Sequence, residues 1–385
     1  MGAIQALLKQ GDNLNVMHAL KDDYAGKFRF VYIDEPYNTG SLSFAYHDRR
    51  SEPEWLLFMR DRLEMLKPLL AADGVIALQC DDNEQARLKV LCDEVFGPEC
   101  FMTTVVVKMS EATGFKMKHV GTRLPKLKEY IHIYKMDRRS PIYPVYTEKE
   151  GWDPEYQNIL LNLDPTEMER LFAIRDNQER TEDDIAEADA LLSRADMTGL
   201  NRYCKDNGIR DLNAFRQDNL WRIFRTVSMP GKANRERALA RLKETGQRFF
   251  TMETPKGQLY LLKDFDQSAA QPRMKMLFAR DYMQVPVCDL WTDIRTTGLE
   301  REGNVSFTDG KKPEKLIKRL LSLFTRPGDW VLDPFAGSGT TGAVCVKTGR
   351  SSVSIELEDA QCQLAKKRLE GECAAHGACF TCDIR

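Results

Sequence analysis

The sequence predicts an α/β protein, because apolar, β-rich runs alternate with segments of helical spacing at both ends of the chain. FRFVYI (28–33) is a short apolar run of the kind that forms a buried strand, and apolar residues then recur at helical intervals over 54–70. Near the C-terminus, a helix that starts beside Pro313 precedes the strand DWVLDPF (329–335). The other expected elements are a helix over 82–95 and strands at VIALQ (75–79), MTTVVV (102–107) and EYIHIY (129–134).

Length and composition narrow the choice of protein class. The 385 residues suffice for one large domain with an insertion or for two domains. Lys and Arg number 56 and Asp and Glu 58, so nucleic-acid binding would have to rest on local basic patches rather than on net charge. No apolar run approaches the length of a membrane span, and the N-terminus lacks a signal-peptide pattern. We therefore expect a cytoplasmic protein without a membrane partner, whose ten cysteines are reduced thiols.

The character of the sequence changes between about 141 and 275. Acidic residues dominate over 164–190, and the sign reverses over 202–248, where twelve Lys and Arg face five Asp and Glu. Aromatic residues are interleaved with these cations, among them Tyr203 and Trp221. Taken alone, the segment is typical of a helical insertion with a solvated charged face.

A glycine-rich turn near the C-terminus predicts a site for an adenosine-containing ligand. Gly337, Gly339 and Gly342 satisfy G-x-G-x-x-G between two predicted strands. Glu356 follows Gly337 by nineteen residues, at the end of the next strand, where an acid can grip ribose hydroxyls. NAD and S-adenosylmethionine both carry adenosine, and a turn needed only for packing is the bland alternative. Asp333, just before the turn, suits a positively charged sulfonium better than a pyrophosphate, so we favour the methyl donor.

The stretch VYIDEPYNTG (31–40) places a carboxylate, a proline and an aromatic ring at the end of a predicted buried strand. An exocyclic base amine is a poor nucleophile, and a site that accepts hydrogen bonds from both of its hydrogens would free its lone pair. Asp34 and the backbone carbonyl of Glu35 could be these two acceptors, and Pro36 would hold Glu35 extended. Tyr37 offers a face on which an extruded base could stack. A β-turn that merely contains proline is the alternative.

With these motifs in place, the sequence resembles the amino-methylating DNA methyltransferases, in particular the permuted (β) class that includes the modification subunits of type III restriction systems. The resemblance runs through most of the chain outside 141–275. In that family the catalytic motif precedes the cofactor motif and a target-recognition domain separates them, as Asp34 precedes Asp333 here. The segments that carry the resemblance are GDNLNVMHAL (11–20), IDEPYNTG (33–40), DNEQARLKVLCDEVFG (82–97), KEYIHIYK (128–135), FTDGKKPEKLIKRLL (307–321), DPFAGSGTT (333–341) and SIELED (354–359).

The resemblance implies a Rossmann-like, S-adenosylmethionine-dependent methyltransferase fold with an inserted, largely helical target-recognition domain. It divides the chain into a catalytic half (1–140), the insertion (141–275) and a cofactor-binding half (276–385). It also implies site residues: for catalysis Asp34, Glu35, Pro36 and Tyr37, and for cofactor binding Asp333, Phe335, Gly337, Gly339, Thr340, Glu356, Lys312 and Pro313.

The implied activity is methylation of adenine N6 in double-stranded DNA by base flipping. Cytosine-N4 methylation uses the same machinery and stays open, although Asp at the first motif position resembles the adenine enzymes. Glu35 replaces the usual first proline of Asp-Pro-Pro-Tyr, so a catalytically weakened DNA-binding relative also stays open. Relatives pair into homodimers, which we expect here by resemblance. A separate restriction subunit and independent action are both left open.

Beside such a catalytic half, the basic part of the insertion is expected to face DNA, with Lys and Arg on phosphates. The candidate DNA contacts are Arg216, Arg222, Arg225, Lys232 and Arg235. The tail CAAHGACFTC contains residue types that bind zinc, but it lacks the usual loop between ligand pairs, so we expect thiols rather than a metal site. The four residues concerned are Cys373, His376, Cys379 and Cys382.

Overall fold

The computed structural model describes residues 3–39, 49–111, 121–122, 124–149, 151–229, 231–294, 296, 298–304 and 310–383. The chain forms two compact units: one combines Met1–Val145 with Val287–Arg385, and the other is the intervening segment Tyr146–Pro286. This second unit starts and ends later than the 141–275 insertion expected from composition. The cause is a short strand that closes it, β13 (Gln284–Pro286), which pairs antiparallel with β6 (Tyr146–Glu148) at its start.

The first unit is built on a mixed sheet, which in the described residues has nine strands in the order β14-β4-β5-β3-β2-β15-β16-β1-β17. All strands from β3 to β17 in this order pair in parallel, whereas β5 is antiparallel to both β3 and β4. The strands are β1 (Gln5–Gln10), β2 (Phe28–Ile33), β3 (Leu70–Cys80), β4 (Phe101–Lys108), β5 (Lys128–Lys135), β14 (Leu290–Trp291), β15 (Trp330–Asp333), β16 (Ser351–Glu356) and β17 (Cys379–Asp383).

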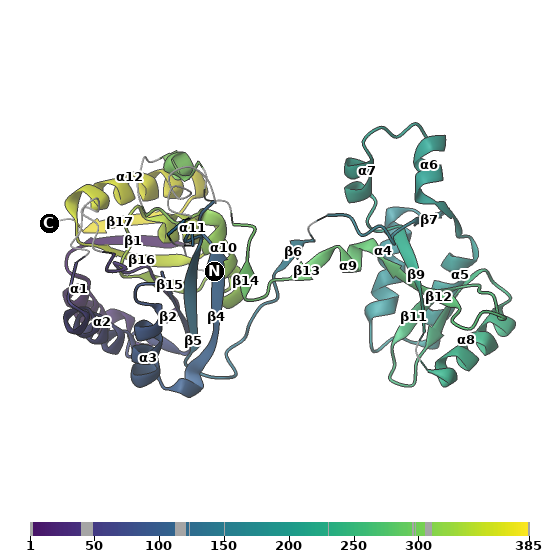
Figure 1. Ribbon diagram of the computed structural model, residues 1–385, viewed down its shortest axis with the longest axis horizontal. Coiled ribbons are helices and arrows are strands. Elements are labelled where there is room, and N and C mark those ends of the chain that lie inside the picture. The colour runs from purple at the N-terminus through teal and green to yellow at the C-terminus, as the bar shows by residue number, and fades with distance from the viewer. Residues whose placement is uncertain are drawn as a thin grey trace. The chain divides into compact units, whose positions relative to one another are not determined.

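Helices cover both faces of this sheet, as Figure 1 shows. Helices α1, α2 and α3 pack on one face around Phe28 and Trp55, and α10 and α11 pack on the other around Phe30 and Leu320. The predicted α/β class is therefore confirmed, with one layer assembled from both ends of the chain. The helices are α1 (Asn13–Tyr24), α2 (Glu52–Leu66), α3 (Gln85–Phe96), η1 (Pro98–Cys100), η3 (Leu299–Asn304), α10 (Glu314–Phe324), α11 (Thr340–Lys347) and α12 (Asp359–His376).

Local sequence accounts for the elements that border the sheet edge used by the site. β2 is buried at every position, as an uninterrupted run covered on both faces should be. Its one charged residue, Arg29, donates to the backbone carbonyls of Asp73 and Pro141. Helix α2 begins with a capping box, in which the side chains of Ser51 and Glu54 each accept a hydrogen bond from the other's backbone N–H.

The order of the parallel strands brings two distant parts of the sequence to one edge of the sheet. β15 lies between β2 and β16, and its Leu332 is opposite Val31 of β2 and Val353 of β16. Because the three strands are parallel, their carboxyl ends lie at the same edge, where ligands of open α/β sheets bind. The turn after β2 and the glycine turn after β15 therefore meet, although about 300 positions separate them.

The second unit is organised around a six-stranded antiparallel sheet in the described residues, in the order β10-β11-β12-β9-β7-β8. This corrects the expectation of a largely helical insertion. Its strands are short, such as NILL (158–161), and short apolar runs carry little periodic signal, so only long-range pairing defines them. The strands are β7 (Asn158–Leu161), β8 (Asp196–Gly199), β9 (Ile223–Ser228), β10 (Phe249–Glu253), β11 (Leu259–Lys263) and β12 (Arg273–Phe278).

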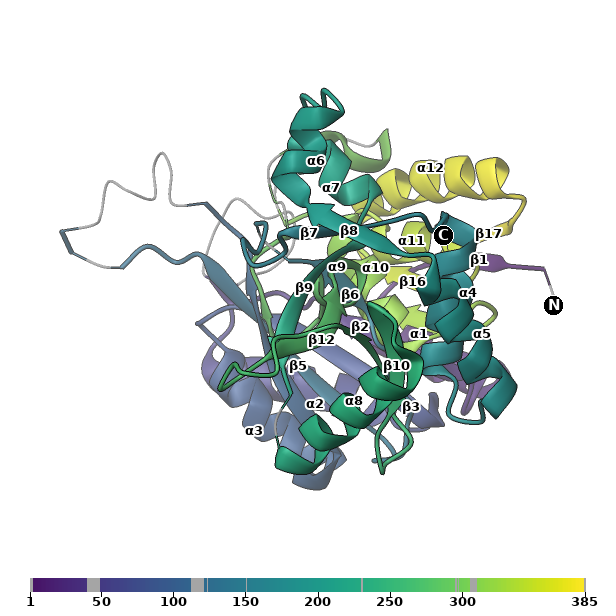
Figure 2. The same cartoon turned by 90° about the vertical axis from the view of Figure 1, so that its right-hand side faces the viewer.

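Helices flank this second sheet. Within the unit, the two short helices α6 and α7 lie side by side at one end, and α8 lies at the other (Figures 1 and 2). Helices α4 and α5 pack on the face formed by Phe224, Phe249 and Phe278. The helices are α4 (Pro165–Asp176), α5 (Glu182–Ser193), α6 (Leu200–Asp206), α7 (Leu212–Asp218), α8 (Lys232–Thr245) and α9 (Ala279–Tyr282).

Two expectations about the chain as a whole can be compared with the structure. All ten cysteines are free thiols, and six of them are buried in apolar surroundings. Over the residues that the structure describes, no helix has both the length and the apolar character needed to cross a bilayer.

Candidate active site

A cavity of about 250 Å³ opens at the sheet edge where β2, β15 and β16 end. Its wall contains both predicted motifs, since the turn after β2 and the glycine turn after β15 line the same space. Of the other predicted site residues, Glu35, Tyr37, Gly339 and Pro313 do not line it. The predicted residues that line the cavity are Asp34, Pro36, Lys312, Asp333, Phe335, Gly337, Thr340 and Glu356.

The three glycines of the G-x-G-x-x-G pattern are needed for different structural reasons. Gly337 and Gly339 have φ angles of +51° and +73°, a left-handed conformation that residues with a Cβ rarely adopt. Gly342 lies in α11, and a Cβ there would be 2.9 Å from both Leu369 Cδ2 and Ser354 Oγ. The first two glycines therefore shape the turn, and the third lets α11 pack closely on β16 and α12.

Two acids flank the glycine turn. The carboxylate of Glu356 accepts hydrogen bonds from the backbone N–H of Gly337 (2.7 Å), Leu357 (2.9 Å) and Glu358 (3.0 Å), which fixes its orientation at the cavity wall. Asp333 is buried and accepts from the Phe335 N–H at 3.0 Å. Burial raises the pKa of Asp333 to about 7, so its charge changes near neutral pH.

The N-terminal segment contributes a third side of the cavity, which sequence reasoning missed. Asn13 donates from Nδ2 to the Pro334 carbonyl at 2.8 Å and accepts at Oδ1 from Arg62 Nε at 2.6 Å. Arg62 also donates to Asp12 at 2.7 Å, and its guanidinium lies 3.6 Å from the centroid of the Phe58 ring. The segment GDNLNVMHAL carried the family resemblance, and this bridge between α1, α2 and the glycine turn explains its position at the site.

Asp34 is the centre of a buried polar network. Lys312 Nζ lies 3.1 Å from Asp34 Oδ1 and 3.2 Å from Glu129 Oε2, so one ammonium joins two carboxylates. The Tyr37 hydroxyl lies 2.6 Å from Asp34 Oδ1 and 3.0 Å from Glu129 Oε2. Burial raises the pKa of Asp34, while the Lys312 cation and the Tyr37 hydroxyl oppose that shift. Burial would lower the pKa of Lys312, but the two carboxylates raise it above its ordinary value.

The network extends to three residues that sequence reasoning did not select. Gln79 donates to Glu129 Oε2 at 2.7 Å and accepts at Oε1 from the Tyr32 hydroxyl at 2.6 Å. Gln79 and Tyr32 are buried within apolar strands of the sheet. A polar residue inside an otherwise apolar predicted strand could have indicated this network, because a buried polar side chain needs hydrogen-bond partners. Glu129, in the quoted segment KEYIHIYK, carries the same signal.

Glu35 points away from the cavity into the protein core. Its side chain is 2% exposed, and neither carboxyl oxygen receives a hydrogen bond from another described residue. Burial, followed by the nearby Asp34 charge, raises the pKa of Glu35 well above its ordinary value. An unpartnered buried carboxylate is very costly, so the neutral acid is the form that fits this environment. The Trp55 indole N–H donates to the Pro36 carbonyl at 3.0 Å and secures the next peptide of the turn.

The five candidate DNA contacts lie in the second unit and differ in the contacts that their side chains make within the protein. Arg222 donates to Asn219 at 2.7 Å and lies over three aromatic rings, and Arg225 pairs with Glu155 and Asp153. Arg216 lies 4.7 Å from the centroid of the Trp152 ring. In α8, Arg235 donates to the Ala270 carbonyl, and the Lys232 side chain is 88% exposed with only a 3.8 Å contact to Glu236. The structure thus gives Arg222 and Arg225 packing and pairing partners inside the unit.

The C-terminal cysteine and histidine residues do not converge. Cys373 is buried in α12, and His376 at its end donates from Nδ1 to the Glu372 carbonyl at 2.9 Å. Cys379 and Cys382 are three positions apart on β17, so they face opposite sides of the strand. Over the described residues, no group of three or more His, Cys, Asp and Glu is arranged to hold a metal ion.

The site thus couples a pocket of the kind that holds an adenosine group to a carboxylate-proline-tyrosine turn. The chain belongs to the DNA methylase family, whose model matches residues 28–367. It is 31% identical over 392 residues to the "Probable type III restriction-modification enzyme HindVI Mod subunit" of Haemophilus influenzae, with 94% of this chain and 50% of that protein covered.

Other relatives and solved structures match over much of the chain. The EcoPI Mod subunit of Escherichia phage P1 is 27% identical over 390 residues, covering 88% of this chain and 54% of its own length. The solved complex of M1.HpyAVI with SAM aligns with 95% of this chain and all of its own, at 13% identity and a TM-score of 0.41. The chain spans about half the length of the curated relatives it matches.

Proposed function

We propose that the chain transfers a methyl group from S-adenosylmethionine to N6 of an adenine extruded from double-stranded DNA. The observation that carries this proposal is the shared cavity, into which both Asp34 and the Asp333–Gly337 turn open. Membership of the DNA methylase family supports the reaction class. The Mod-subunit names of the relatives support DNA as the substrate.

The residues around the glycine turn fit the proposed methyl donor. Apart from its two chain neighbours, no described residue has an atom within 4 Å of a Cβ built on Gly337, so the backbone leaves free space at the cavity wall. The fixed carboxylate of Glu356 retains lone pairs that can accept from ribose hydroxyls. The buried carboxylate of Asp333 suits a cationic group. When bound, S-adenosylmethionine supplies an electrophilic methyl group on a positively charged sulfur.

Asp34 and the peptide of Glu35 act on the base. The Asp34 carboxylate accepts one hydrogen bond from the adenine amine, and the Glu35 carbonyl accepts the other, which directs the nitrogen lone pair toward the methyl donor. The Lys312 ammonium favours the ionised form of Asp34, which only accepts hydrogen bonds, and so opposes the rise in the pKa of Asp34 that burial causes. Lys312 was expected among the cofactor contacts. Its position in the cavity wall is compatible with that expectation, and its ion pairs with Asp34 and Glu129 support a further role in the charge balance of the turn after β2. The proton released by the amine passes to water.

The second unit is the proposed DNA-recognition part. Lys232 offers an exposed cation for a phosphate, and Arg235 lies on the same helix, α8. Arg216 lies on α7, at the other end of the unit, and is a separate candidate contact. By resemblance, the protein acts as a homodimer, alone or with a separate restriction subunit.

The test is a transfer assay with S-adenosylmethionine labelled on its methyl group and unmethylated duplex DNA. The expected result is label in DNA, recovered after digestion as N6-methyldeoxyadenosine identified by mass. Recovery of N4-methyldeoxycytidine would support DNA methyl transfer but would change the target from adenine N6 to cytosine N4. DNA binding with no label transfer would contradict the proposed activity, and nicotinamide-nucleotide binding without S-adenosylmethionine binding would contradict the proposed donor.

A further inference from the structure

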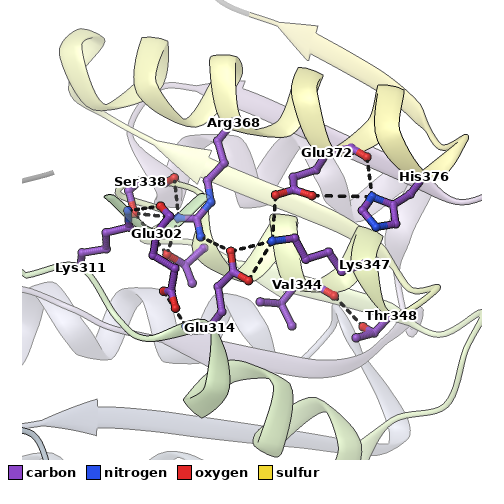
Figure 3. A network of polar contacts seen from close by, with 11 residues as sticks. Glu302, Lys311, Glu314, Ser338, Val344, Lys347, Thr348, Arg368, Glu372 and His376 are labelled. Atoms are coloured by element: carbon purple, nitrogen blue, oxygen red, sulfur yellow. Dashed lines mark hydrogen bonds and ion pairs between the residues drawn. The ribbon is translucent and has the colours of Figure 1, made fainter. Parts of the chain in front are cut away.

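A buried arginine joins the glycine turn to the helix that follows Lys312. Arg368 lies on α12, and its side chain is fully buried although it does not line the cavity. Its Nη1 donates to Thr340 Oγ1 at 2.8 Å and lies 3.4 Å from the Ser338 carbonyl, and both of these residues line the cavity. Its Nη2 donates to Glu314 Oε1 at 2.7 Å, in the first turn of α10. Figure 3 shows the guanidinium of Arg368 between Ser338 and Glu314.

Glu314 is the point where several contacts meet. Lys347 Nζ donates to the two carboxylate oxygens of Glu314 at 2.9 Å and 2.8 Å. The backbone N–H of Glu314 donates to Glu302 Oε2 at 2.9 Å. Burial alone would raise the pKa of Glu314, but the hydrogen bonds from Lys347 and Arg368 lower it, so it remains a carboxylate. Lys311 donates to the Glu302 carbonyl, which ties the segment before α10 into the same group (Figure 3).

The backbone also packs directly on the arginine. Gly303 has a φ of +68°, and a Cβ placed there would be 2.5 Å from Arg368 Nε and 2.8 Å from Cζ. A side chain at this position would displace the guanidinium. The segment η3 therefore closes over Arg368, which explains why Nε is buried without a hydrogen-bond partner among the described residues.

We propose that Arg368 is a positioning residue that holds the glycine turn in register with the start of α10, and so with Lys312 and Asp34. Its planar guanidinium has two arms, and each arm contacts one of the two parts of the methyltransferase unit that the reaction must align. Lys312 lies two residues before Glu314 and contacts Asp34. This inference rests on the proposed methyl transfer, because register between donor and catalytic turn matters only for that reaction.

The decisive variant is Arg368→Lys. A lysine keeps the charge that Glu314 requires, but a single ammonium cannot replace a fork that reaches two partners in fixed directions. The variant is expected to melt cooperatively within a few degrees of the wild type. Its Kd for S-adenosylmethionine should rise about tenfold, the loss of one good hydrogen bond. Its single-turnover transfer rate at saturating S-adenosylmethionine should also fall about tenfold, because the two motifs are no longer aligned.

Lys347→Met is the matched control. Lys347 contacts Glu314 and Glu372, but it reaches neither Ser338 nor Thr340. Its removal should leave the Kd and the single-turnover rate within about twofold of the wild type. Equal losses of S-adenosylmethionine binding and transfer rate in Lys347→Met and Arg368→Lys would mean that the contacts around Glu314 only stabilise the fold. That result would overturn the positioning role of Arg368.

Thr340→Val supplies a second route if Arg368→Lys fails to fold. It removes the hydroxyl that Arg368 contacts and leaves the Arg368–Glu314 pair intact, so the Kd should rise as in Arg368→Lys. When both variants fold, the double variant should bind no more weakly than the weaker single variant, because both remove one interaction. Additive losses, or wild-type binding and transfer in Arg368→Lys, would overturn the proposal. Absence of S-adenosylmethionine binding in the wild type would instead contradict the proposed function itself.

Discussion

Replacing Lys312 by methionine tests how the catalytic turn keeps its charge. The ammonium lies 3.1 Å from Asp34 and 3.2 Å from Glu129, and its side chain is only 9% exposed. At an effective dielectric constant of about 20, a pair at this separation attracts by about 5 kcal/mol. Burial offsets part of this attraction, and removing one partner of a buried pair costs about 3–5 kcal/mol. The variant therefore leaves two partly buried carboxylates, 19% and 20% exposed, without the ammonium that joins them.

The consequence for catalysis is a change of protonation. Without Lys312, the pKa of Asp34 rises, since burial and the Glu129 charge both favour the neutral acid. A protonated Asp34 has lost its negative charge and carries an O–H donor on one oxygen, so it is a much weaker acceptor for the adenine amine than the carboxylate. A loss of about 3 kcal/mol corresponds to a fall in rate of about 100-fold at neutral pH. Activity should recover as the pH rises, because ionisation of Asp34 restores the charged, stronger acceptor for the amine.

The assay is single-turnover methyl transfer to duplex DNA between about pH 5.5 and 9, at saturating S-adenosylmethionine. Lys315→Met is the control, because Lys315 lies three residues after Lys312 in the first turn of α10, is exposed and pairs with Asp293 at 2.8 Å rather than with Asp34. The control should follow the wild-type profile. A Lys312→Met variant with a wild-type rate and an unchanged pH profile would refute this account of Asp34.

Three further predictions follow from the buried acids and the close-packed glycines. S-adenosylmethionine should bind more weakly as the pH falls through about 7, because protonation of Asp333 removes the negative charge that would face the bound sulfonium. Calorimetry should show this pH dependence of binding in the wild type and not in Asp333→Asn. Glu35 ionises in the unfolded chain near its ordinary pKa but stays neutral in the folded protein to higher pH, so folding stability should fall with rising pH by up to about 1.4 kcal/mol per unit. Urea unfolding of Glu35→Gln should lack this slope, and parallel slopes for the two proteins would contradict a neutral Glu35. Gly342→Ala should destabilise the folded protein by about 1–3 kcal/mol, because the added Cβ would overlap Leu369. Gly371→Ala in α12, with open space around the added Cβ, should instead raise the melting temperature. Equal shifts in melting temperature for the two variants would contradict the packing argument.

Much of the first unit could be predicted from the sequence because its signals are local. β2 spans Phe28–Ile33, the run chosen from its apolar pattern, and α10 begins at Glu314, beside the Pro313 that signalled it. The glycine turn and the acid of the next strand also have fixed spacing, so both could be located by their residue pattern. Parallel pairing of β2 and β15 then brings Asp34 and the glycine turn to one cavity.

The parts that sequence reasoning missed depend on contacts between distant segments. Glu129 reaches Lys312 only because β5 pairs antiparallel with β3, and no local pattern announces that pairing. The sheet of the second unit was missed for the same reason, since its strands are short and their partners lie far along the chain. Arg222 stays a candidate DNA contact, but its contacts with aromatic rings and with Asn219 depend on the folded unit and could not be predicted from the charge pattern.

The most direct measurement compares donor binding with methyl transfer in Asp34→Ala. The account predicts that this variant binds S-adenosylmethionine with a Kd close to that of the wild type, because the glycine turn and Glu356 are untouched, and that label transfer to DNA is abolished. Transfer at the wild-type rate by a protein lacking this carboxylate would show that the base amine is activated elsewhere and would contradict the central claim.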